Sequence, residues 1–78
     1  MVTERKIRLH NLTEIKNFIV IATKYNCDVT VKTRNKVVDG KSMMGIVSLL
    51  RYQPLLVIAE GDDADDFLVQ LNQHFKTK

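Results

Sequence analysis

The spacing of hydrophobic residues along this 78-residue chain predicts four strands and three helices. Residues 4–9 alternate apolar and polar side chains, as a half-buried strand does. Residues 12–25 then carry apolar side chains every three or four positions, which is the spacing of one helix face. Period-two patterns and one continuous apolar run predict the other three strands, over residues 28–33, 36–38 and 55–59.

The first predicted helix carries signals for both of its ends. Asn11 is a favourable N-cap, and Glu14, three residues later, can complete a capping box. We therefore expect the helix to begin at Leu12. Asn26 tolerates the left-handed conformation that commonly ends a helix, so we expect this helix to end near Asn26.

The last predicted helix follows Gly61 and is acidic at its beginning. Carboxylates are favourable at the positive N-terminal end of a helix, and ammonium groups at the other end. The first turns hold four aspartates and the far end two lysines: Asp62, Asp63, Asp65 and Asp66, then Lys76 and Lys78. The aspartates lack the spacing of a calcium-binding loop, so we interpret them as helix capping and predict no metal site.

A short third helix is predicted to begin after Ser42, in the middle of the chain. Ser42 is a suitable N-cap, but the apolar run behind it is too short to form a stable helix alone. This segment must therefore lie on a larger scaffold and expose part of its surface to a partner. We expect Met43 to be exposed and Met44 to point inward, with the alternative that both simply seal the core.

These elements follow the order strand, helix, strand, strand, helix, strand, helix. The run 55–59 is apolar on both faces, which is typical of a central strand. The apolar faces of the three helices must all be buried, and one face of the sheet can cover them. The sequence therefore predicts an α+β open-faced β-sandwich. In this fold, three helices pack on one face of a four-stranded antiparallel sheet. A chain of this length forms one domain, spanning residues 1–78.

Composition narrows the classes of function. The net charge of +3 is mild, and the basic residues alternate along predicted strands, as solvated faces do. We therefore expect no nucleic-acid partner, although the basic strands leave nucleic-acid binding open as a weaker alternative. No apolar run is long enough for a membrane span, and no secretory signal is visible. A single cysteine, Cys27, fits a cytoplasmic protein and is expected to be buried.

The run from Lys41 to Leu49, read as Lys-Ser-x-Met-Gly-x-x-Ser-Leu, resembles HPr, the histidine phosphocarrier protein of the phosphoenolpyruvate:sugar phosphotransferase system. The stretch 22–29 and the order of elements are similar too. In HPr proteins of low-GC Gram-positive bacteria, a dedicated kinase phosphorylates the serine of this run as a regulatory signal. The resemblance implies that Ser42 is that serine.

The phosphoryl-accepting motif of the family, Gly-Ile/Leu-His-Ala-Arg-Pro, is absent at the start of the first helix. Alignment without a gap places Asn11 at the position of the histidine, Thr13 at that of the arginine and Glu14 at that of the proline. Asn11 cannot accept a phosphoryl group as an imidazole does, and Glu14 adds negative charge where a phosphate needs the opposite. We find no Gly-rich phosphate loop or Ser-His pair, and we predict neither an enzyme nor a cofactor.

Two functional hypotheses follow from the resemblance. The first is a non-catalytic regulatory or adaptor module, similar to the family's paralogue in carbon catabolite repression. Its partners would be phosphotransferase-system proteins, HPr kinase or a transcriptional regulator, bound through Asn11, Thr13, Lys41, Met43 and Val47. The alternative is an active phosphocarrier that uses His10, one residue before the expected position, as the acceptor of a phosphoryl group from Enzyme I.

Overall fold

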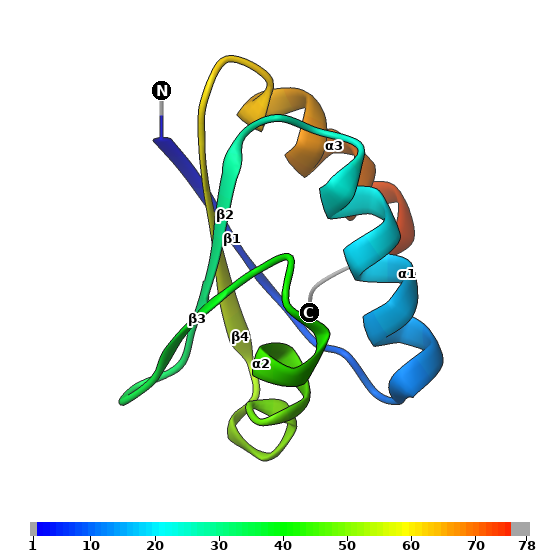
Figure 1. The fold of residues 1–78 in the computed structure, drawn as a ribbon, viewed down its shortest axis with the longest axis vertical. Helices are drawn as coiled ribbons and strands as arrows, with labels where there is room; N and C mark the ends of the chain where they lie inside the picture. The colour runs from blue at the N-terminus through cyan, green and yellow to red at the C-terminus, as the bar shows by residue number, and fades with distance from the viewer. Residues whose placement is uncertain (1, 76–78) are drawn as a thin grey trace.

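The computed structural model describes residues 2–75 and has the predicted order of strands and helices (Figure 1). A 3₁₀ turn, η1, is the one addition to the predicted elements. The elements are β1 (Val2–Ile7), α1 (Leu12–Thr23), β2 (Asp28–Lys32), β3 (Val37–Asp39), α2 (Met43–Val47), η1 (Leu50–Tyr52), β4 (Leu55–Glu60) and α3 (Ala64–His74). Lys76 and Lys78, expected at the end of α3, lie outside the described residues.

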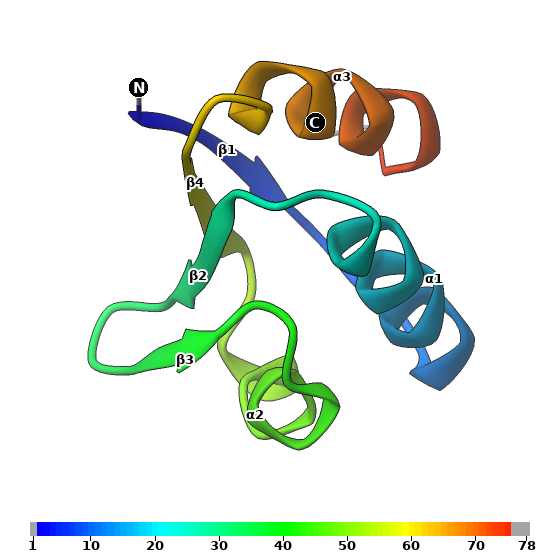
Figure 2. The same ribbon diagram turned by 45° about the horizontal axis from the view of Figure 1, so that its top comes forward.

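The four strands form one antiparallel sheet in the order β1-β4-β2-β3, with the helices covering one face (Figures 1 and 2). The predicted α+β open-faced sandwich and the central position of β4 are therefore confirmed. On β4, Val57 and Ala59 are fully buried under the helices, whereas Leu56 and Ile58 are half-buried on the opposite face. This alternation leaves one face of the sheet to solvent.

Aromatic side chains join the two long helices in the core. The ring of Phe18 on α1 meets the ring of Phe67 on α3 edge to face, with the centroids 6.2 Å apart. Phe75 lies at the same centroid distance from Phe18, and Phe18 and Phe67 are completely buried. This cluster fixes α1 against α3. None of the helices in the described part of the chain is long and apolar enough to cross a membrane.

The end of α1 differs from the prediction. The helix stops at Thr23, and none of the described residues other than Gly61 has a positive φ, so Asn26 does not adopt the left-handed conformation. The last turn instead tightens through 3₁₀ bonds, in which the amide of Lys24 donates to the carbonyl of Ile21 at 3.1 Å. The ammonium group of Lys41 donates to the Tyr25 carbonyl at 2.9 Å, so this helix end needs no glycine-like cap.

Candidate partner-binding surface

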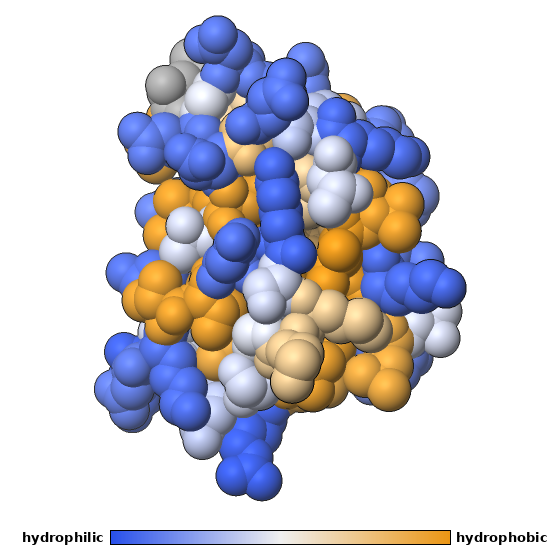
Figure 3. Space-filling model, viewed as in Figure 1, coloured by the Kyte–Doolittle hydropathy of each residue, from blue (hydrophilic) through white to orange (hydrophobic). Residues whose placement is uncertain are grey.

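The beginning of α1 and the short helix α2 lie side by side in both ribbon views (Figures 1 and 2). Apolar side chains on both helices reach solvent: Leu12 is 59% exposed, Met43 42% and Val47 39%. The space-filling view shows hydrophobic surface over α2 and the neighbouring part of α1 (Figure 3). We call Leu12, Met43, Met44 and Val47 the apolar patch. Exposed apolar groups grouped in this way are typical of protein-binding sites.

Met44 contradicts one prediction. Its side chain is 85% exposed, whereas we expected it to point inward. The physical reason is that α2 has only five residues and buries a single side chain, Ile46. Helical geometry puts Met44 and Ile46 about 200° apart around the axis, so they face opposite directions. Met43, predicted to be exposed, is indeed exposed, and two flexible methionines therefore lie beside Val47.

Ser42 begins α2 as its N-cap, as the sequence predicted. Its hydroxyl oxygen accepts a hydrogen bond from the amide of Gly45 at 3.2 Å, and the side chain is half-buried. Glycine at position 45 allows α2 to lie close to β3, because a Cβ there would stand 3.0 Å from the Cβ of Val38. The hydroxyl therefore sits at a helix end that is held firmly against the sheet.

Lys41 is next to Ser42 in sequence, but its ammonium group is directed elsewhere. It donates to the carbonyl of Tyr25, at the negative C-terminal end of α1, while the backbone amide of Lys41 donates to the Asp39 carboxylate at 2.9 Å. Lys41 is only half-exposed. Its role in the folded protein is therefore to join the end of α1 to the start of α2, beside any role in binding.

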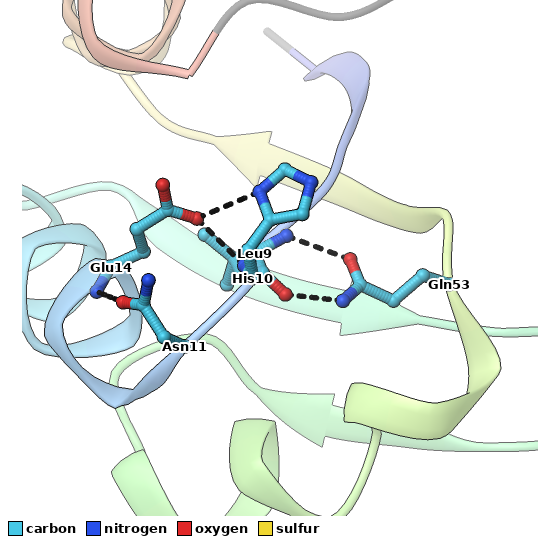
Figure 4. A network of polar contacts seen from close by, with 5 residues as sticks. All are labelled: Leu9, His10, Asn11, Glu14 and Gln53. Atoms are coloured by element: carbon cyan, nitrogen blue, oxygen red, sulfur yellow. Dashed lines mark hydrogen bonds and ion pairs between the residues drawn. The ribbon is translucent and has the colours of Figure 1, made fainter.

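At the beginning of α1, backbone amide groups donate hydrogen bonds to side-chain oxygen atoms of the same chain. The side-chain oxygen of Asn11 accepts from the amide of Glu14 at 2.9 Å, as predicted for an N-cap (Figure 4). The Glu14 carboxylate reaches back, but to the amide of His10 at 2.6 Å rather than to that of Asn11. The same carboxylate oxygen lies 3.1 Å from Nδ1 of His10. Thr13, on the first turn, is exposed.

Hydrogen bonding affects the charge of Glu14. Its pKa is lowered chiefly by the bond from the His10 amide and further by the His10 ring, while partial desolvation acts in the opposite direction. Glu14 therefore remains a carboxylate at neutral pH. A fixed negative charge thus stands at the beginning of α1, where it opposes the binding of an anion.

Glu14 should make the folding stability depend on pH in the acidic range. Because folding lowers its pKa, the carboxylate stabilises the native state above the unfolded-state pKa, and this contribution is lost as the pH falls through the folded-state pKa, over roughly pH 5 to 3. Glu14→Gln keeps an acceptor for the His10 amide but cannot titrate. We expect the fall in melting temperature between pH 7 and pH 3.5 to be smaller in this variant. An equal fall in both proteins would contradict this role.

Sequence reasoning missed the part played by Gln53, which we placed in a loop. Its side-chain oxygen accepts from the amide of Leu9 at 2.7 Å, and its side-chain nitrogen donates to the Leu9 carbonyl (Figure 4). Gln53 thus holds the residue that precedes His10 as a neighbouring strand would. The two partners are 44 residues apart, so no local pattern pointed to this contact.

At the acidic beginning of α3, one aspartate binds a distant part of the backbone in addition to lying at the helix N-terminus. Asp63 forms no side-chain bond within its own helix. Its carboxylate instead accepts from the amides of Asn26 and Cys27, at 2.8 and 2.9 Å, and these bonds lower its pKa. Cys27 is buried, as predicted, and burial raises the pKa of its thiol. No group of three or more metal-binding side chains converges within residues 2–75.

Comparison with known proteins gives a consistent result. A protein-family model described as the PTS HPr component phosphorylation site matches residues 13–77. HPr-C-His from Thermoanaerobacter tengcongensis is 32% identical, with a TM-score of 0.70 over 94% of this chain and 91% of that one. The Bacillus subtilis catabolite repression containing protein Crh is 29% identical, with a TM-score of 0.68 over 86% and 78% of the two chains. The phosphocarrier protein HPr from Bacillus anthracis, at 22% identity, supports the fold with a TM-score of 0.77 over 96% and 98%.

Proposed function

Since the chain belongs to the HPr family of the phosphotransferase system, we propose that it is a non-catalytic regulatory or adaptor member. It would act in the cytoplasm by binding protein partners through the start of α1 and the apolar patch on α2. The name of the relative Crh refers to catabolite repression, which is a regulatory process. This name supports the proposal of a regulatory role for the present chain. The partners we expect are phosphotransferase-system components, HPr kinase or a transcriptional regulator.

One observation carries this proposal: two backbone amides at and just before the beginning of α1 already donate to side-chain oxygen atoms of the chain itself. Asn11 takes the amide of Glu14, and the Glu14 carboxylate takes the amide of His10. A phosphoryl group at this end would have to displace these bonds and approach a carboxylate. Thr13 supplies no positive charge in compensation. These contacts favour a protein that binds others over one that carries phosphate at this helix.

Ser42 is the residue through which we expect regulation. Phosphorylation would place roughly −2 charge at the N-terminal end of α2, where free amide groups and the helix dipole tolerate it. The hydroxyl is half-buried at the edge of the apolar patch, beside Met43. A phosphate there would change the charge of the binding surface without requiring a new fold. The alternative without regulation is that Ser42 serves only as the N-cap of α2.

We expect HPr kinase with ATP to add one phosphoryl group to this protein, detected as a mass increase that Ser42→Ala abolishes. The variant should lose about 1 kcal/mol of folding stability with the cap, so it remains folded for the assay. Ser48→Ala is the matched control, because the hydroxyl of Ser48 is exposed and donates to the carbonyl of Gly45. An unmodified wild-type protein would exclude regulation by this kinase.

A second candidate function rests on His10. Its ring is 70% exposed at the start of α1 and is oriented by the Glu14 carboxylate at Nδ1. An imidazole held by a carboxylate is a recurring arrangement for nucleophiles. If His10 carries phosphate, phosphoenolpyruvate and Enzyme I should produce an acid-labile phosphoryl group that His10→Ala removes. The regulatory proposal expects no such group in the wild type, so this assay separates the two.

A further inference from the structure

The solvent-facing side of the sheet has charges separated by sign. At one end, strand pairing places Asp28 opposite Glu60, with Glu4 in the next row. At the other end, Lys6 on β1 and Lys32 on β2 both pair with Leu56 on β4, from opposite sides. Paired residues project from the same face of a sheet. Two lysines therefore flank one apolar residue at the basic end.

Two adjoining cavities open at this basic end, between the β2–β3 hairpin and the segment that joins η1 to β4. The larger has a volume of about 500 Å³ and the smaller about 330 Å³, and they share four lining residues: Thr33, Arg34, Tyr52 and Gln53. Lys6 and Lys32 line the larger cavity and Lys36 the smaller. We call the two together the basic groove. Each of the two volumes lies within the range of small-molecule sites.

The positive charges of the basic groove have no carboxylate partners among the described residues. No carboxylate lines either cavity. Among residues 2–75, the contact of His10 with Glu14 is the single one that brings a basic nitrogen within 4.0 Å of a carboxylate oxygen, so no groove cation is paired in this way. Lys36 instead lies 5.4 Å from the centre of the Tyr52 ring, which is 44% exposed. Four cations and an aromatic ring thus converge on one concave surface.

We infer that the basic groove binds a compact organic phosphate, such as a nucleotide or a sugar phosphate. Adjacent strands are about 4.8 Å apart, so the Cα atoms of Lys6 and Lys32 are separated by roughly 10 Å, and their flexible side chains can reach a common phosphate. The planar guanidinium of Arg34 can hold two phosphate oxygens at once. Tyr52 offers a surface for a base or sugar ring.

The acidic end of the same face determines the size of the ligand. A long polyanion that crossed the sheet from the basic groove would meet Glu4, Asp28 and Glu60 and be repelled. A compact anion remains at the basic end and avoids them. Ser42 lines neither cavity, so a failure of this inference would leave the proposal on Ser42 untouched.

Backbone amide NMR shifts of the wild-type protein, titrated with inorganic phosphate, ATP, inorganic triphosphate and ribose 5-phosphate, test this inference. We expect the shifts to concentrate at residues 32–36 and 52–56. Lys32→Ala with Arg34→Ala should weaken binding by about tenfold or more, since each charged contact is worth about that much. Both residues are exposed, so the double variant should fold. Lys16→Ala on α1 with Lys24→Ala at its C-cap, both exposed, removes the same charge and should change affinity by no more than about twofold.

The probes also distinguish the two sources of phosphate. Tighter binding of ATP than of triphosphate, lost in Tyr52→Leu, identifies a nucleotide site. Tighter binding of ribose 5-phosphate than of inorganic phosphate, with no such gain for ATP, identifies a sugar phosphate. Equal weakening in both double variants would overturn the inference, as would the absence of localised shifts. A single-stranded oligonucleotide that binds more tightly than every small probe would overturn the restriction to a compact ligand.

Discussion

Replacing Gly61 by alanine should lower the free energy of unfolding by about 3 kcal/mol, the largest effect we predict. Gly61 has φ = +148°, a conformation in which a side chain is strained. A Cβ at this position would also stand 2.9 Å from the Cα of Cys27, and backbone at that distance cannot yield as a flexible side chain does. The two costs add, because one concerns local conformation and the other packing.

A loss of this size is a large part of the roughly 4–12 kcal/mol expected for a domain of this length. It should lower the melting temperature by about 15 °C, which thermal unfolding followed by circular dichroism can measure. Asp62→Ala is the matched control, since Asp62 is the exposed neighbour and should change stability by no more than about 0.5 kcal/mol. Equal melting temperatures for the two variants would show that the turn after β4 relaxes freely.

Gln53→Ala should cost about 2 to 3 kcal/mol and should loosen the chain just before α1. The variant leaves the amide and the carbonyl of Leu9 without their partners, and Leu9 is 1% exposed, so water cannot easily replace them. Urea unfolding measures the stability. Amide hydrogen exchange at Leu9 measures the local loosening, because this amide should lose protection before the core amides do.

Gln73→Ala provides the comparison for Gln53. Gln73 is an exposed glutamine on α3 whose side chain makes only a long contact of 3.5 Å with Gln70. Its replacement should have little effect on stability or on exchange at Leu9. If the two variants unfold at the same urea concentration, the contact between Gln53 and Leu9 contributes nothing to the native state. Because Leu9 precedes His10, the variant also reveals whether the site at α1 needs this support.

The elements of the fold were predictable where local patterns decide the outcome. Residues 12–23 form a helix because apolar spacing and the Asn11 cap agree, and β4 is central because it is apolar on both faces. The Ser42 cap was predicted correctly for the same reason. In each case, one short segment contains both the signal and the groups that satisfy it.

Sequence reasoning failed at loops and helix ends where a backbone group forms its hydrogen bond with a residue that is distant in the sequence. Asn26 was expected to end α1 by itself, but Lys41 takes up the carbonyl of Tyr25 and Asp63 the amide of Asn26. The contact of Gln53 with Leu9 was missed because it joins two loops. The basic groove could not be predicted from local sequence patterns either, because Lys6 and Lys32 are brought together only by the pairing of β1 and β2 with β4.

The central place of β4 sets the order in which this protein can fold. Both of its neighbours, β1 and β2, precede it in the chain, and the pairs between β1 and β4 run from Ile7 with Leu55 to Val2 with Glu60, 48 to 58 residues apart. The β2–β3 hairpin can close early because its strands are adjacent, but β1 has no sheet partner until β4 has been synthesised. Such distant pairing slows folding, since the long loop must close before the contacts stabilise it. A nascent chain therefore cannot complete its sheet until β4 has emerged from the ribosome.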